Sequence, residues 1–83
     1  SNINWFFLSK ISNDEKYIFA TLNSSSEIAV IDSQSMNIIE KNKVASFPVG
    51  LAISEDDKYL AVTSQGKDGL GGGNHVDIFE LKK

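Results

Sequence analysis

The chain has 83 residues, no cysteine and a formal net charge of −3, so it can form one small domain and no disulfide. A chain of this size buries only about 60–65% of its unfolded surface and is marginally stable alone. Its eight basic residues are all Lys and form no large cluster, which argues against nucleic acid as a partner. The longest apolar run, Trp5–Leu8, is far shorter than the ~20 residues of a membrane span, so membrane insertion is not expected.

Two ten-residue stretches, Ser12–Thr21 and Ser54–Thr63, are near-copies of each other at an offset of 42 residues. Each has a polar turn that ends in Lys and then a short apolar run that begins with Tyr. A repeat of 20–50 residues is typical of propellers, solenoids and repeat arrays. We therefore interpret residues 1–83 as a single domain made of two units, about 1–42 and about 43–83.

The two units differ in length at one place. Glu27–Asp32 in the first unit matches His75–Glu80 in the second, but the offset there has grown to 48 residues. The six extra residues all fall in the stretch Ser64–Asn74. Repeat proteins tolerate insertions in loops, and such loops often carry function.

Short runs rich in β-branched and aromatic residues, separated by Ser, Asn, Asp and Gly, predict β-strands, and sustained helical periodicity is absent from the sequence. The runs fall into four in the first unit and three in the second. The expected strands are Phe6–Ile11, Tyr17–Leu22, Ile28–Ile31, Met36–Lys43, Val49–Ser54, Tyr59–Ser64 and Val76–Phe79.

The polar turns have a simple local explanation. Ser12 and Asp14, like Ser54 and Asp56, can accept hydrogen bonds from nearby backbone N–H groups and hold a tight hairpin. The Lys that follows each turn is expected to be a surface partner of these acids, with a contribution well under ~1 kcal/mol.

The stretch Phe47–Thr63 resembles the repeat of YVTN-type β-propellers, which read approximately Pro-x-Gly-x-Ala-x-Ser-x-Asp-Gly-Lys-x-x-Tyr-Val. Ile28–Asp32 resembles the Val-Ser-Val-Ile-Asp strand of the same family. The Gly-His and Trp-Asp signatures of WD repeats are absent from the sequence, which favours the YVTN-type branch. The chain departs from the family pattern at the turn glycine, which is replaced by Glu15 and Asp57.

The resemblance implies an all-β fold made of propeller blades, each a four-stranded antiparallel sheet. There would be two blades, the second without its outer strand, and they would form part of a larger ring. Runs such as Leu51–Ile53 fit sheets that are apolar on both faces because each face packs on a neighbouring blade. The expected partners are the remaining blades of the same propeller or further copies of the chain.

The stretch Ser64–Asn74 is a glycine-rich loop, and it is the strongest candidate for ligand or partner contact. Glycine has no side chain, so its backbone can approach a bound group closely. It matches no P-loop, dinucleotide-binding or EF-hand pattern, and the alternative is a plain flexible connection. We expect no cofactor. The candidate contact residues are Lys67, Asp68, Gly71, Gly72, Gly73, Asn74 and His75.

The remaining candidates favour structural roles. His75 and Asp77 could give a metal ion only two ligands, so a strand-edge position is expected for His75 and a paired or edge position for Asp77. Trp5 and Phe47 match in repeat register and are expected to pack between blades. Asn23 begins a glycosylation sequon that matters only in a glycosylating compartment.

Three hypotheses about function follow. The first is a binding or scaffold module that presents loops to a protein or a small ligand, with an extracytoplasmic location implied by the family resemblance. The second is an enzyme, because propellers similar to this one include lactonases and quinoprotein dehydrogenases; the lack of a catalytic constellation favours a non-enzyme. The third is a repeat protein that assembles with copies of itself.

Overall fold

The computed structural model describes residues 6–66 and 75–81, and all regular structure in these ranges is β-strand. The predicted order of strands, four in the first unit and three in the second, is confirmed. The predicted and observed bounds of each strand differ by no more than two residues. Within these ranges no helix is long and apolar enough to cross a membrane. The strands are β1 (Phe6–Ile11), β2 (Tyr17–Leu22), β3 (Glu27–Asp32), β4 (Ile38–Lys43), β5 (Pro48–Ile53), β6 (Tyr59–Ser64) and β7 (His75–Glu80).

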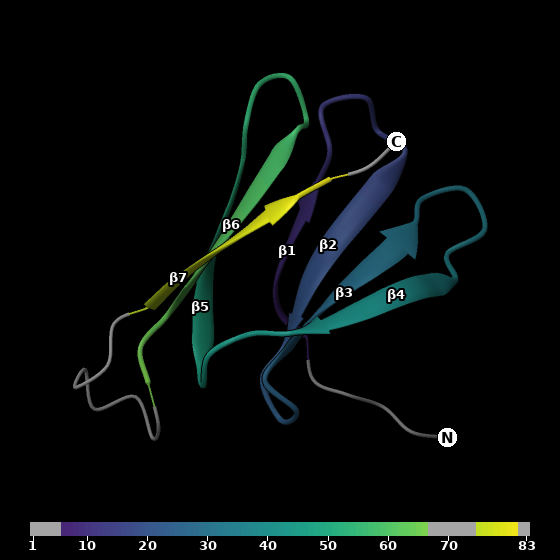
Figure 1. The fold of residues 1–83 in the computed structure, drawn as a ribbon. Coiled ribbons are helices and arrows are strands. Elements are labelled where there is room, and N and C mark those ends of the chain that lie inside the picture. Colours follow the sequence, from purple (N-terminus) through teal and green to yellow (C-terminus); the bar gives the residue numbers. More distant parts are fainter. Residues whose placement is uncertain (1–5, 67–74, 82–83) are drawn as a thin grey trace.

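The strands form two antiparallel sheets, each with its strands side by side in chain order (Figure 1). We call β1-β2-β3-β4 the first sheet and β5-β6-β7 the second sheet. The sheets come closest where β5 lies against β1 and β2. β1 and β2 begin 42 residues before β5 and β6, and β3 begins 48 residues before β7, so the strands follow the offsets of the sequence repeat.

The first turn is held by its own side chains, as predicted. Ser12 Oγ donates to Asp14 Oδ1 at 2.6 Å, and the same carboxylate oxygen accepts the backbone N–H of Lys16 at 3.0 Å. The second turn repeats this pattern, with 2.7 Å from Ser54 Oγ to Asp56 Oδ1. In both turns the Lys residue therefore contributes its backbone N–H to the acid, a contact independent of the ammonium group predicted to pair with it.

The two turns have left-handed residues at the position where the YVTN-type repeat pattern has glycine. Glu15 has φ 63° and Asp57 has φ 60°, so both lie in the left-handed region that glycine enters without a steric penalty. An L-residue pays about 1–2 kcal/mol there. The turn geometry typical of glycine is thus kept although the glycine is not.

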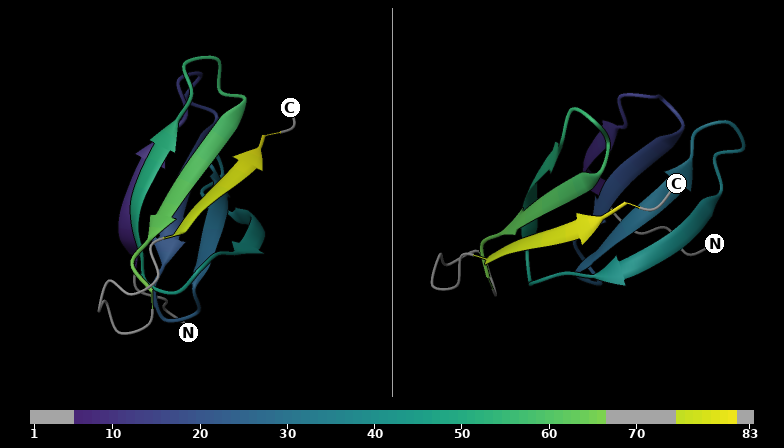
Figure 2. Two further views of the ribbon diagram at one scale, coloured as in Figure 1. Left: turned by 60° about the vertical axis from the view of Figure 1, so that its left-hand side comes forward. Right: turned by 45° about the horizontal axis from the view of Figure 1, so that its top comes forward.

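The two sheets lie next to each other (Figure 2), and the main core is formed by side chains from both. Phe19 and Ile28 from the first sheet meet Leu60 and Val62 from the second, and each of the four is at most 1% exposed. Burial of side chains of this size stabilises the fold by about 1.5–3 kcal/mol each. This cluster joins the two sheets into one unit.

The opposite face of the first sheet carries a second buried cluster of Ala20, Leu22, Ala29 and Ile31. The prediction that Trp5 and Phe47 pack between the sheets receives no support. Trp5 lies outside the described residues. Phe47, just before β5, is 37% exposed, has φ 60° and belongs to neither buried cluster.

The opposite face of the second sheet is uncovered in the described part of the chain. Val76 and Ile78 on β7 are 62% and 61% exposed, and Tyr59 on β6 is 46% exposed. These side chains alternate with those that face the first sheet, such as Phe79. The second sheet is therefore apolar on both faces, as the family resemblance implies, but only one face is covered.

Candidate functional site

Most of the predicted contact loop lies outside the described residues: Lys67, Asp68, Gly71, Gly72, Gly73 and Asn74. His75 is the exception. It is the first residue of β7, pairs with Ser64 across the sheet and is exposed, in agreement with the strand-edge position expected for it. Residues 6–66 and 75–81 contain no group of three or more metal-binding side chains, so His75 has no metal cluster around it in these ranges.

Two polar residues near the ends of this loop have contrasting environments. Asp77 is half-buried on β7 and its Oδ2 accepts the backbone N–H of Ala45 at 3.0 Å, so it is paired as expected. Ser64 is 3% exposed, and its Oγ has no hydrogen-bond partner among residues 6–66 and 75–81. A buried hydroxyl group without a hydrogen-bond partner costs about 1–3 kcal/mol of folding stability. Among the described residues, Ser64 at the start of the loop carries such a hydroxyl group.

Asn23, the sequon residue, lies in the turn between β2 and β3. It is half-buried, and its Oδ1 is also buried with no hydrogen-bond partner in the described part of the chain. This turn occupies the position in the first unit that the long glycine-rich loop occupies in the second.

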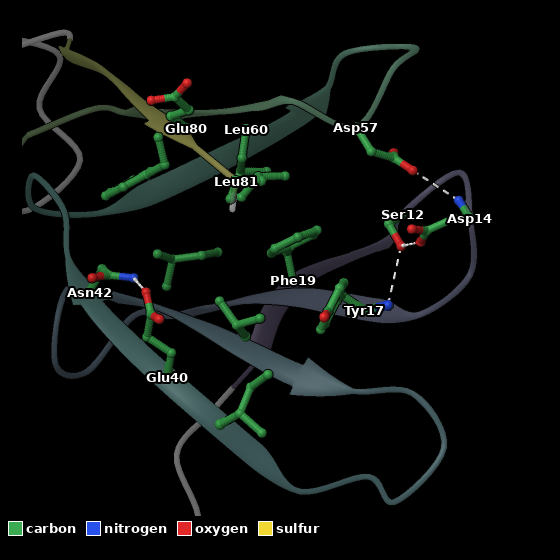
Figure 3. A pocket seen from close by; sticks show the side chains of 14 residues that line it. Ser12, Asp14, Tyr17, Phe19, Glu40, Asn42, Asp57, Leu60, Glu80 and Leu81 are labelled. Atoms are coloured by element: carbon green, nitrogen blue, oxygen red, sulfur yellow. Dashed lines mark hydrogen bonds between the residues drawn. The ribbon is translucent and has the colours of Figure 1, made fainter. Parts of the chain in front are cut away.

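A cavity of about 430 Å³ lies between β7 and the strands of the first sheet. Its floor is the main core, since the buried side chains of Phe19, Ile28 and Leu60 line it. Figure 3 shows β7 and β4 on opposite sides of this space. The volume is near the lower end of the range for ligand pockets, about 300–1,000 Å³.

One end of the cavity is formed by the two polar turns. Asp57 is 5% exposed, and its carboxylate accepts three hydrogen bonds from the turn of the first sheet. The donors are Asn13 N at 2.8 Å, Asn13 Nδ2 at 3.0 Å and Asp14 N at 2.9 Å. This end of the cavity is closed by contacts that fix one sheet against the other.

The other end is bordered by β4. Ile39 lines the cavity and is 56% exposed. Asn42 donates its Nδ2 hydrogen to Glu40 Oε2 at 2.6 Å, which holds the carboxylate on the cavity side of the strand (Figure 3). The described residues that line the cavity include the acids Asp14, Glu40, Asp57 and Glu80 and no Lys, Arg or His, so this part of the lining combines an apolar floor with an acidic border.

Two acids outside this lining have shifted ionisation. Hydrogen bonds from the backbone N–H groups of Ser35 and Gln34 lower the pKa of Asp32 below 3.8. The Ser54 hydroxyl and then the Lys58 backbone N–H lower the pKa of Asp56 below the same value. In both turns the hydrogen bonds stabilise the ionised carboxylate, so the role of these two acids is structural.

The cavity has the chemistry of a binding surface. Its apolar floor can bury side chains, and its polar turn residues are already engaged in hydrogen bonds that hold the fold. Analysis of the sequence missed it because residues from both units line it.

No protein-family model matches the sequence, and no curated protein matches it. Solved structures do resemble it. Hydrazine synthase of Kuenenia stuttgartiensis superposes with a TM-score of 0.81 at 17% sequence identity, over 98% of this chain and 21% of that one. The β-propeller domain of Cps50 (Swd1) from Myceliophteria thermophila gives 0.69 at 16% identity, over 94% of this chain and 29% of that one.

At these identities the likeness shows the fold alone. The chain spans less than a third of the length of either structure. Together with the two antiparallel sheets of four and three strands, it shows that this all-β chain has the fold of adjacent β-propeller blades, the second with three strands.

Proposed function

We propose that the chain is a binding and scaffold segment of a β-propeller of the YVTN type. It is completed by further blades and presents the loop between β6 and β7 to a protein or a small ligand. The observation that carries the proposal is the uncovered apolar face of the second sheet, with Val76 and Ile78 more than 60% exposed. In a propeller such a face packs on the next blade.

Several features support completion by further blades. Among the described residues β7 pairs with β6 alone, so one edge of the second sheet has no partner strand in residues 6–66 and 75–81. The principal-axis extents of 36 × 33 × 15 Å fit a flat segment, as two adjacent blades would be. An outer apolar face and an open edge on one small chain are liabilities that a neighbouring blade removes.

Solution mass and stability test this part of the proposal. Residues 1–83 alone should be a weakly stable species with a melting temperature below about 45 °C, the low end for ordinary domains. Sedimentation and thermal unfolding measure both quantities. A monomer that unfolds cooperatively above about 60 °C would show that no further blade is required.

The proposed contact residues in the loop are Lys67, Asp68, Gly71, Gly72, Gly73, Asn74 and His75. The proposal rests on the six-residue insertion at this place and on the exposure of His75. A ligand screen by NMR would follow the backbone amide signals of the loop. The expected shifts concentrate in residues 67–75, and the matched control is the shorter turn at Asn23–Ser26 in the first unit.

A location outside the cytoplasm belongs to the same proposal and rests on the resemblance to YVTN-type propellers. Fractionation of cells that express the natural protein tests it directly, because a purely cytoplasmic pool would contradict it. None of the contacts described above favours an enzymatic role over binding.

A further inference from the structure

We propose that the end of the molecule opposite the two polar turns binds a neutral saccharide. We call this the linker end, and it consists of the β2–β3 turn at 23–26, the linker at 44–47 and the last residue of β6, Ser64. Figure 1 shows the β2–β3 turn and the linker at the bottom and the polar turns at the top. The inference goes beyond the proposed loop function, because it places a ligand on residues outside the 67–74 loop.

The linker 44–47 is fixed along its length. Val44 contacts the 23–26 turn, and Phe47 follows three residues later, at most about 11 Å further along an extended chain. Phe47 is therefore held close to this turn. Each linker residue has a backbone partner at 3.0 Å: Val44 N donates to Ser26 O, Ala45 N to Asp77 Oδ2, Gly66 N to Ser46 O and Gln65 N to Phe47 O.

Phe47 is an exposed aromatic residue in a strained backbone conformation. Its φ of 60° lies in the left-handed region, where an L-residue pays about 1–2 kcal/mol. With 37% of its surface exposed and no place in either buried cluster, it gains little burial in return. Backbone strain that the surrounding structure holds in place is typical of ligand sites. We infer that the ring of Phe47 is kept at the surface as a platform for a ligand.

The linker end also holds buried polar atoms without partners. Three such side-chain atoms occur in residues 6–66 and 75–81, and all belong to this end: Asn23 Oδ1, Ser25 Oγ and Ser64 Oγ. Buried groups of this kind are normally satisfied by a bound water or ligand. Asn23 and Ser25 are half-buried, so rotation of either side chain presents its oxygen to a ligand. Ser64, at 3% exposure, is out of reach.

The chemistry of this end favours a neutral ligand. Lys43 Nζ donates to Ser25 O at 2.9 Å, and Asp77 accepts from Ala45 N, so both ionic groups are engaged within the fold. The groups that remain are an aromatic ring, an amide and a hydroxyl. A sugar ring has a face of C–H groups that packs on an aromatic ring, and its hydroxyl groups pair with amides and hydroxyls.

A peptide ligand fits the linker end less well than a saccharide. An extended peptide binds by pairing with the open edge of a strand. The linker end presents a turn and a linker whose backbone groups already pair within the fold. The saccharide needs no strand edge, because its contacts are with side chains.

A titration of the purified protein with neutral trisaccharides, followed through its backbone amide NMR signals, tests the site. The probes are cellotriose, maltotriose, mannotriose and chitotriose. We expect at least one of them to shift the signals of residues 23–26 and 46–47, with a dissociation constant below about 1 mM.

The first variants test the aromatic platform. Phe47→Gly removes the ring and also the left-handed strain, so it should fold at least as well as the wild type and bind the sugar at least about tenfold more weakly. Phe47→Tyr keeps the ring and should bind within about threefold of the wild type. Tyr59→Ala is the control, because it removes a 46% exposed aromatic residue at the other end of the second sheet. It should change the affinity less than about twofold.

Two serine variants test the polar contacts. Ser25→Ala should weaken binding about fivefold, because it removes a hydroxyl that the ligand reaches. Ser64→Ala is the control, since its hydroxyl is equally unpaired among the described residues but too buried to touch a ligand, and it should stay within about twofold. Both variants should keep or raise the melting temperature, because each removes an unpaired buried hydroxyl. A loss of binding by Ser25→Ala alone is therefore independent of stability.

Three results would overturn the proposal. One is no shift at 23–26 or 46–47 with any probe at concentrations up to about 10 mM. Another is binding that Phe47→Gly leaves unchanged. The third is an equal loss of affinity in Ser25→Ala and Ser64→Ala. A ligand of the 67–75 loop alone leaves the 23–26 turn unshifted, so the loop function stands or fails on its own signals.

Discussion

Asp57 in the second sheet and Asn13 in the first are joined by two hydrogen bonds to the same carboxylate oxygen. Asp57 Oδ1 accepts from the backbone N of Asn13 at 2.8 Å and from its Nδ2 at 3.0 Å. Glu15 occupies the matching position of the first turn, with nearly the same φ. The two turns therefore share a backbone conformation at this position. The Asp57 side chain, in addition, joins the two sheets through its hydrogen bonds to Asn13.

This relationship predicts opposite effects for one substitution at two matched positions. Glu15→Gly removes the cost of a left-handed residue and should raise the free energy of unfolding by about 1 kcal/mol. Asp57→Gly removes the same cost but also three hydrogen bonds to a charged acceptor, so it should lower that free energy by about 2 kcal/mol. Urea unfolding of the two variants measures both, and changes of equal sign would contradict the assigned role of Asp57.

Gly50 is predicted to be required by contact with its neighbour across the sheet. A Cβ placed there would lie 2.3 Å from Thr63 Oγ1, next to the register shift between Pro48 and Gly50. Gly50→Ala should cost about 1 kcal/mol, because the Thr63 side chain must rotate away. Adding Thr63→Ala should recover most of this loss in a double-mutant cycle measured by chemical denaturation. Additive effects would show that the two residues do not interact.

The uncovered face of the second sheet predicts self-association of the isolated chain at high concentration. Replacing Val76 and Ile78 together by Thr keeps strand propensity and makes the face more polar, so association should fall about tenfold or more. Ile38→Thr, at 46% exposure on the first sheet, is the comparison and should have little effect. Sedimentation equilibrium over a concentration series gives the constants. If the wild-type protein, the double variant and Ile38→Thr associate equally, the surface that mediates association lies elsewhere.

The lowered pKa values of Asp32 and Asp56 predict a loss of stability in acid. Because both folded values lie below the unfolded value of 3.8, their contribution is present well above pH 3.8 and is lost as the pH falls through the folded values. Asp32→Asn keeps an acceptor for the turn but cannot ionise. Melting temperatures from pH 7 to pH 2 should therefore fall less steeply for this variant below pH 4. Identical pH profiles would contradict the role given to Asp32.

The strands could be predicted because their signals are local. Tyr17–Leu22 and Tyr59–Ser64 carry the residue types of buried strands and are bounded by clear turn residues, so their predicted and observed limits coincide. The hydrogen bonds of Ser12 and Asp14 were predictable for the same reason, since they span only a few residues.

The cavity and the Asp57 contact could not be predicted in the same way. Asp57 reaches a residue 44 positions away, and nothing in its own turn distinguishes it from Glu15 at the matching place. The exposure of Phe47 was missed because repeat register fixes the position of a residue along the chain but not its burial or its backbone conformation, here a φ of 60°. Such features depend on how the two sheets meet.

The long reach of the Asp57 contact also sets an order of events in folding. The hairpins of each sheet close short loops. The contact between Asp57 and Asn13 closes a loop of 44 residues, which has a larger entropy cost. The hairpins should therefore form early and the two sheets should dock late. Substitutions at Asp57 should then speed unfolding and leave the folding rate almost unchanged.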